Sequence, residues 1–327
     1  MANYKDIHGT NIETVSSDPS NPVNGQVWYN STTQTLKGFT QNPAGSWATG
    51  NAMNTGRYSA NATGTSTSAI AFGGRISPPN VIQDVAETYN GSSWTEVADL
   101  NTARFQFGSS SSGSATAALA FGGTCPPPTP TVNAETWDGS SWTEGANLNT
   151  ARYSVAGCGT TTAAIAVNGS SNVTETWDGS SWTEVADIST DRLAGRALGG
   201  SSNAIMAGGE QPASPYAIYA QTESWNGSAW TEVNDLNAAG HVAGGAGDQS
   251  SGMIFGGSRP GKVALTENWN GTSWTEVGDL NVVVNHSAGA GTTTAALSIG
   301  GDLGPASTAN VEDYTSPLDA TVTFDVS

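Results

Sequence analysis

A ten-residue pattern that recurs along the chain limits what the chain can fold into. The stretch Glu87 to Glu96 reads Glu-Thr-Tyr-Asn-Gly-Ser-Ser-Trp-Thr-Glu, and close copies begin at Glu135, Glu175, Glu223 and Glu267. The Trp near the end of each copy belongs to a series spaced 40 to 48 residues apart, namely Trp47, Trp94, Trp142, Trp182, Trp230 and Trp274. A period in the forties with regular Trp is typical of propeller blades, so we assign these six Trp residues a structural role.

Each repeat reads as a meander of four strands, here called a to d. In one unit the expected strands are Tyr153 to Cys158, Ala163 to Val167, Val173 to Trp177 and Ser181 to Val185. Strands c and d are separated by Asn-Gly or Asp-Gly, the strongest short hairpin signal, because a type I′ turn needs two residues with positive φ. Five units also end strand b with a Gly pair. The sequence therefore predicts an all-β chain of four-stranded antiparallel blades.

These features resemble the repeats of the kelch family over roughly residues 46–316. In one unit the matching residues are Gly122, Gly123, Glu135, Trp137, Trp142, Leu148 and Arg152. The resemblance implies a kelch-type β-propeller in which the repeated Glu and Arg are structural, since an active site needs one constellation and not six. The Arg position holds Arg57, Arg104, Arg152 and Arg192, and then Gly240 and Val284. We therefore expect a Glu–Arg pair early in the ring and none late.

Two closures of the ring fit the sequence. Residues 51–327 contain six repeats, and residues 1–50 contain an N-terminal segment with two further expected strands, Gln26 to Asn30 and Thr35 to Phe39. Either this segment makes a degenerate seventh blade, or the strand of Trp47 completes the sixth blade and the upstream hairpin lies outside. The sequence favours seven blades, with six as the alternative. Ala320 to Val326 is a candidate final strand.

The N-terminal segment carries a second resemblance. Gly25 to Thr33, with Leu36-Lys37, Ser46-Trp47 and the preceding Asp18 to Pro22, resembles a meander found in bacteriophage tail and other virion proteins. Joined to a Lys-poor, Gly/Ser/Thr-rich kelch ring, it makes the chain resemble virion and tail accessory proteins of marine phages. This resemblance implies a tail-fibre or adhesion role in receptor binding, at the surface of an extracellular particle, with the N-terminal segment contacting other virion proteins.

The charge balance excludes some partners. Asp and Glu outnumber Lys and Arg by 28 to 10, and the only lysines are Lys5, Lys37 and Lys262. Nucleic-acid binding requires cations that neutralise phosphates, so neither DNA nor RNA is expected as a partner. We expect no membrane insertion, because the sequence has no 18-residue apolar run, and no secretion signal, because the first residues lack an apolar segment.

Variation between the repeats is concentrated between strands b and c. These b–c loops differ in length, contain several prolines, and all emerge on one face of a propeller. Loops held by a rigid scaffold commonly carry function, and proline lowers the entropic cost of ordering them. We therefore predict a partner-binding face, for a host-surface glycan or protein, that includes Arg75, Pro79, Pro127, Tyr216, Tyr219, Arg259 and Lys262. Alternatively, these loops vary because nothing constrains them.

The sequence offers no catalytic or metal-binding constellation, so we expect no enzyme activity, no metal and no cofactor. Copper oxidases among kelch proteins need a Tyr–Cys crosslink and two His ligands, whereas the three histidines here, His8, His241 and His286, have no paired spacing. A glycosidase carboxylate pair stays open as an alternative, as does a soluble kelch protein–protein interaction module. Cys125 and Cys158 are expected near opposite faces, so both should be free thiols.

Overall fold

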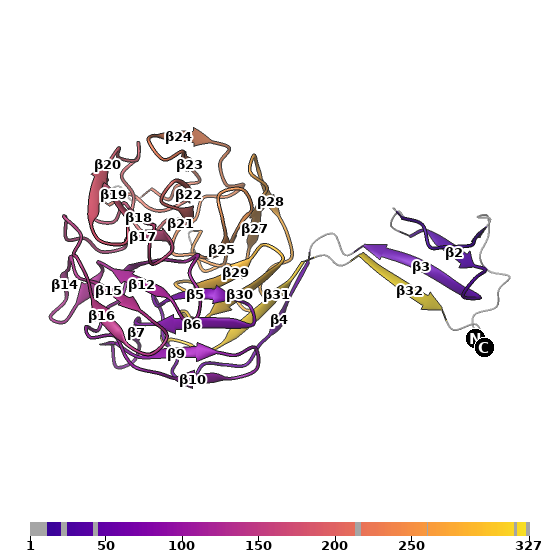
Figure 1. The fold of residues 1–327 in the computed structure, drawn as a ribbon, viewed down its shortest axis with the longest axis horizontal. Helices are drawn as coiled ribbons and strands as arrows, with labels where there is room; N and C mark the ends of the chain where they lie inside the picture. The colour runs from indigo at the N-terminus through magenta and orange to yellow at the C-terminus, as the bar shows by residue number, and fades with distance from the viewer. Residues whose placement is uncertain are drawn as a thin grey trace. The chain divides into compact units, whose positions relative to one another are not determined.

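The computed structural model describes residues 12–20, 25–41, 45–212, 217–259, 261–316 and 319–324. The chain divides into two compact units, residues 46–315 and a smaller unit that joins residues 1–45 to residues 316–327. The regular elements of the described residues are β-strands (Figure 1). No described segment forms a helix long and apolar enough to cross a membrane.

The larger unit is a β-propeller, and its described strands form six blades around a common centre (Figure 1). Blade 1 contains β5 (Asn61–Thr65), β6 (Ser68–Phe72), β9 (Ala86–Tyr89) and β10 (Trp94–Glu96). Blade 2 contains β11 (Gly108–Ser109), β12 (Ala118–Phe121), β15 (Ala134–Trp137) and β16 (Trp142–Glu144). Blade 3 contains β17 (Ala156–Gly159), β18 (Ala164–Val167), β19 (Thr174–Trp177) and β20 (Trp182–Val185).

The remaining blades follow the same plan. Blade 4 contains β21 (Arg196–Gly200), β22 (Asn203–Ala207), β23 (Thr222–Trp225) and β24 (Trp230–Val233). Blade 5 contains β25 (Gly244–Gly247), β26 (Gly252–Phe255), β27 (Thr266–Trp269) and β28 (Trp274–Glu276). Blade 6 contains β29 (Ala288–Thr292), β30 (Ala295–Ile299), β31 (Val311–Thr315) and, from the start of the unit, β4 (Ser46–Thr49).

The closure of the ring corrects the favoured blade count. Strand β4 pairs antiparallel with β31, so that Trp47 lies opposite Tyr314 and Ser46 lies opposite Thr315. The strand of Trp47 thus completes the sixth blade, and seven blades, the favoured expectation, is wrong. The physical reason is that the upstream strands find their partner elsewhere, in the smaller unit. The propeller therefore begins at residue 46, within the segment 1–50 that the sequence assigned to the N-terminus.

The smaller unit has one sheet in the order β1-β2-β3-β32. Strands β2 (Val27–Asn30) and β3 (Thr35–Gln41) confirm the two expected upstream strands, whereas β32 (Asp319–Phe324) pairs with β3 instead of joining a blade; β1 (Glu13–Val15) runs parallel to β2. Asp18 accepts hydrogen bonds from the side chains of Trp28, Asn30 and Lys37 at 2.6 to 3.0 Å. The bond from Lys37 contributes most to lowering the pKa of Asp18 to about 2.

Each of the six repeated Trp residues packs in a hydrophobic cluster that spans two neighbouring blades. Each packs against the aromatic residue of strand c in its own blade, for example Trp142 against Trp137 with ring centroids 5.6 Å apart. Three also meet a Phe from strand b of the preceding blade, at 4.8 to 4.9 Å (Trp47–Phe255, Trp142–Phe72 and Trp182–Phe121). Burying such large apolar rings between blades is a major source of stability.

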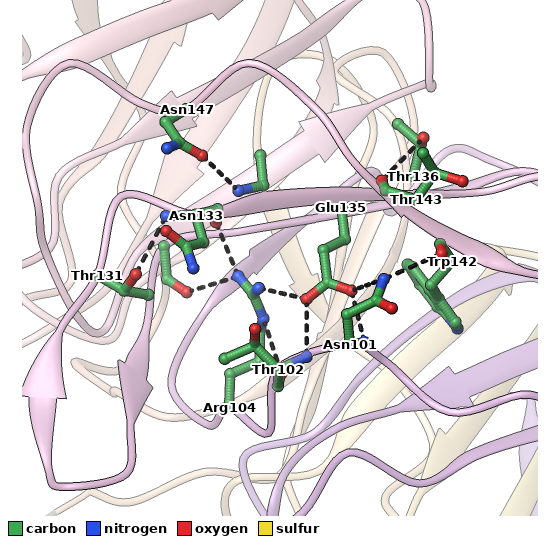
Figure 2. A network of polar contacts seen from close by, with 12 residues as sticks. Asn101, Thr102, Arg104, Thr131, Asn133, Glu135, Thr136, Trp142, Thr143 and Asn147 are labelled. Atoms are coloured by element: carbon green, nitrogen blue, oxygen red, sulfur yellow. Dashed lines mark hydrogen bonds and ion pairs between the residues drawn. The ribbon is translucent and has the colours of Figure 1, made fainter.

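A buried ion pair joins the repeated Glu of strand c to an arginine in five of the six described blades. In blade 2, Glu135 pairs with Arg104 at 2.6 Å and accepts backbone N–H bonds from Asn101 and Thr102 (Figure 2). Arg104 also donates to the carbonyl oxygens of Gly122 and Asn133, so neither buried charge is left unpaired (Figure 2). The same pair recurs as Arg57–Glu87, Arg152–Glu175 and Arg192–Glu223. The repeated Glu and Arg are thus structural in four blades.

The fifth blade departs from the expectation that its ion pair is absent. Arg259, from the b–c loop, pairs with Glu267 at 2.8 Å. A Cβ added at Gly240, the repeat's Arg position, would lie 2.9 Å from Arg259 Nε, so the missing side chain leaves the space that Arg259 fills. In blade 6, Glu312 instead accepts bonds from the Asn281 and Val282 backbone and from the Asn281 side chain.

Candidate functional site: the loop face and the axial pit

A closed ring of backbone hydrogen bonds surrounds the propeller axis. Each ring residue lies just before an innermost strand and donates its N–H to the carbonyl oxygen of the ring residue in the preceding blade, at 2.7 to 3.5 Å. All six have φ between 50° and 55°, a region that costs a non-glycine residue about 1 kcal/mol or more. The ring residues are Ser59, Gln106, Ser154, Ala194, Val242 and His286. Each ring residue lies two positions after the repeat's Arg position, although the six residues share no residue type.

The b–c loops emerge at the same end as this ring, and together they form the loop face. In five blades a residue just after the second strand bridges to the residue preceding the ring, as Arg75 does to Tyr58 and Asp302 to Asn285. The loops of blades 1 and 2 form small hairpins of their own, β7–β8 (Arg75–Ile76 and Val81–Ile82) and β13–β14 (Thr124–Cys125 and Thr129–Pro130). The loops are therefore anchored at their bases by backbone pairing.

Glycine makes these loop bases possible. Gly122 and Gly123 both have positive φ, 63° and 91°. A Cβ on Gly123 would lie 2.5 Å from the Cβ of Phe107, which no real structure tolerates. Gly123 thus allows close approach within blade 2, whereas a Cβ on Gly122 would lie 3.2 Å from the Arg152 carbonyl oxygen, which belongs to the link that leads into blade 3.

The predicted binding residues fall into different environments. Pro79 and Pro127 are exposed at loop tips, and Tyr219 is half-buried. Arg75 is also half-buried, with its guanidinium 5.1 Å from the ring centroid of Phe105 in the next blade. Tyr216 lies outside the described residues.

Two predicted surface cations have structural partners instead. Arg259 is not a surface cation, because its side chain is 7% exposed and is held by Glu267. Lys262 donates to the Asp302 carboxylate at 2.8 Å and to the Asp302 carbonyl at 3.0 Å, which ties the loop of blade 5 to that of blade 6. The sequence alone could not find these pairs, because Arg259, Lys262 and Asp302 lie outside the repeat pattern.

Neighbouring loops contact each other around the face. Ser307 in the loop of blade 6 donates its N–H to the Ser77 carbonyl in the loop of blade 1, and the Ser77 N–H donates back to Ser307 Oγ. Glu210 Oε2, in the loop of blade 4, lies 3.0 Å from Nδ1 of His241 at the start of blade 5. These contacts and the Lys262–Asp302 pair join the loops of blades 5, 6 and 1 and tie the loop of blade 4 to the start of blade 5.

The centre of the loop face holds a cavity of about 80 Å³, here called the axial pit. It is lined by the ring residues and by the first residues of several innermost strands, including Asn61 and Arg196. Such a volume holds only a few water molecules or one small solute. Farther along the innermost strands, Ser112 in the a–b turn of blade 2 bonds to the carbonyls of Gly159 in blade 3 and Gly199 in blade 4, so this turn reaches across neighbouring blades.

Two titratable side chains line the pit. Burial lowers the pKa of Arg196 to about 10, so it remains a cation at neutral pH. Burial also lowers the pKa of His286 to about 4, so the imidazole is neutral, and its ring meets Tyr58 edge-on at 5.7 Å. His241 and His286 do not form a ligand pair, because His241 faces Glu210 and does not line this pit.

The cysteines behave as expected, since Cys125 and Cys158 are both buried free thiols. Complete burial raises the pKa of Cys158 to about 12, which leaves it protonated and unreactive at neutral pH. Among the described residues, no group of three or more His, Cys, Asp or Glu is placed to hold a metal ion.

Comparison with known proteins shows the fold. No family model matches the chain, and no curated protein matches it. Among solved structures, the chain is similar to YjhT with a TM-score of 0.64 and 12% sequence identity, over 84% of this chain and 99% of that one. At this identity the likeness extends to the β-propeller fold and carries no residue roles.

Proposed function

We propose that this protein is a non-enzymatic binding protein that presents its loop face to a partner. The observation that carries the proposal is the contrast between a repetitive scaffold and varied loops that are anchored at their bases by backbone bridges. Because backbone bridges hold the loop bases, a partner loses less free energy to loop ordering when it binds. The exposed Pro79 and Pro127 lie at the tips that a partner would meet first.

We further propose that the protein acts on a virion, as a tail-fibre or adhesion protein that contacts a host-surface glycan or protein. Two things support this proposal: the resemblance of the N-terminal meander to phage tail proteins, and the existence of a separate unit, residues 1–45 with 316–327, available for assembly with other virion proteins. The kelch-like repeat supplies the rigid carrier for the host-contact face.

The alternative is a soluble kelch module that binds a protein partner. What favours it is the likeness to YjhT, because the match covers 99% of that chain and shows that a propeller can make up nearly an entire protein. Mass spectrometry of purified particles from the source distinguishes the two. We expect this chain at stoichiometric copy number in particles; absence from particles, with the protein free in the cell, would overturn the virion role.

The loop face itself is tested by binding to host cells. Replacing residues 126–129 of the blade 2 loop by two serines removes an exposed tip without touching the Thr124 bridge to Phe105. A matched control replaces residues 160–162, in the a–b turn at the other end of blade 3, by serines. We expect the first variant alone to lose binding, and equal binding by both would refute the assignment of the loop face.

A further inference from the structure

The axial pit contains a cation that the protein does not neutralise. None of the residues that line the pit is Asp or Glu, although the chain carries a formal charge of −18. Arg196 has no ion pair among the described residues; its Nη2 donates to the Gly245 carbonyl at 3.2 Å, and its buried Nε has no hydrogen-bond partner. The four arginines at the repeat position and Arg259 each pair with a carboxylate, and the absence of such a partner sets Arg196 apart from them.

Unused hydroxyl groups lie in the same pit. Ser59 is 9% exposed and Ser287 is 5% exposed, and neither Oγ has a hydrogen-bond partner. Buried polar groups without partners are uncommon in native proteins, and each calls for an explanation such as a bound solute. The hydroxyl groups of Ser59 and Ser287 do not hydrogen-bond to each other, so both can bond to a solute in the pit.

A pair of glycines in blade 5 creates the space for these groups. A Cβ on Gly245 would lie 2.8 Å from Arg196 Cγ, and a Cβ on Gly244 would lie 2.8 Å from Ser287 Oγ. Arg196, from blade 4, and Ser287, from blade 6, therefore lie against adjacent residues of the strand between them. Because successive residues of a strand face opposite sides, Arg196 and Ser287 flank β25 from its two sides, and both line the pit.

We propose that the axial pit binds one small carboxylate through Arg196 and Ser287. A planar guanidinium donates two parallel hydrogen bonds to a carboxylate, and a serine hydroxyl adds a third donor. The size of the pit limits the ligand, or the part of it that enters, to a small group. With His286 neutral, the pit has a single positive charge and matches a monoanion. This inference rests on the pit alone and does not depend on what the loop tips bind.

The test is isothermal titration of the whole protein with sodium acetate in a buffer free of other carboxylates. We expect one saturable site per chain. The variant Arg196→Met should weaken binding more than tenfold, Arg196→Lys less than Arg196→Met, and Ser287→Ala by a smaller factor. Lys37→Met, which removes an equal charge from the smaller unit, should bind acetate as the wild type does.

A second variant covers the case in which Arg196→Met fails to fold. Gln106→Glu places a carboxylate among the pit residues, where it competes with and repels the ligand, so we expect acetate binding to be lost. The proposal is overturned if the wild type shows no saturable acetate binding, or if a folded Arg196 or Gln106 variant binds acetate as tightly as the wild type.

Discussion

At the residue scale, the repeated Trp side chains differ in whether their indole N–H finds a partner. Trp274 Nε1 donates to Thr222 Oγ1, and Trp47 Nε1 to Thr266 Oγ1, both at 3.1 Å. Trp182 has no such partner, because Ala134 occupies the corresponding position at the start of strand c in the preceding blade. The indole N–H groups of Trp142 and Trp230 are also buried without a partner, and at Trp182 the bonds made by Trp274 and Trp47 indicate which residue could supply the acceptor.

The variant Ala134→Thr should supply that acceptor. We expect it to raise the free energy of unfolding by about 1 kcal/mol, the net contribution of a typical hydrogen bond, as measured by chemical denaturation. Ala134→Val is the matched control, because it adds similar volume without a hydroxyl. Equal stabilisation by Val and Thr would show that filling space, and not the hydrogen bond, is responsible.

The relocated arginine of blade 5 makes a second prediction. Arg259→Met leaves Glu267 as an unpaired buried charge, so we expect a loss of about 3–5 kcal/mol of stability. Adding Gly240→Arg returns an arginine to the repeat position and should recover part of the loss. Lys262→Met, which removes only a partly exposed pair, should cost about 1 kcal/mol or less. If Gly240→Arg recovers nothing, the two positions are not interchangeable sources of the cation.

His286 predicts a pH dependence. Its folded pKa of about 4 lies below the ordinary value of 6.5, so the unfolded state binds more protons between these values. Stability from this group is therefore complete above pH 6.5 and falls as the pH drops towards 4, by at most about 3 kcal/mol. We expect the free energy of unfolding of His286→Gln, measured by urea denaturation, to depend less on pH between pH 4 and 6.5 than that of the wild type. An equal pH dependence in the two proteins would mean that the imidazole is not held neutral.

At the element scale, the sequence predicted the blades well because their signals are local. Asn-Gly and Asp-Gly turns, the Gly pairs and the Trp spacing each act within one repeat. The second, third and fourth strands of blade 3 lie within one residue of their expected bounds, whereas the first begins at Ala156, three residues after the expected Tyr153. The blade count failed because β4 and β31 are joined by pairing between distant parts of the chain, which no local pattern records. Arg259 was misplaced for a related reason: its partner depends on an absent side chain at Gly240.

The candidate site also combines features with a local sequence signal and features that depend on distant parts of the chain. The sequence located the loop face through variation between repeats, yet it missed the axial pit. The pit depends on backbone conformation at six ring positions and on a single non-repeated residue, Arg196. The ring residues share a positive φ but no residue type, so composition gives no sign of them.

At the scale of the whole molecule, closure of the ring by β4 makes a prediction about truncated chains. Residues 46–315 contain all four strands of every described blade, so we expect this fragment to unfold cooperatively at a temperature near that of the full protein. Residues 51–327 lack β4, which leaves an unpaired edge on β31 and removes the Trp47 contacts with Phe255 and Tyr314. Calorimetry should show a clearly lower Tm for the second fragment, and equal values would contradict the closure.

The antiparallel pairing of β4 with β31 places the first and last residues of the propeller, Ser46 and Thr315, opposite each other. The flanking segments then contribute β3 and β32, which pair with each other in the smaller sheet. The propeller is therefore an insertion in the sequence of a smaller domain, and the chain enters and leaves the propeller through two adjacent, paired strands. Such a layout lets recombination exchange one whole propeller for another, while the domain that carries it keeps its own fold and its own attachments.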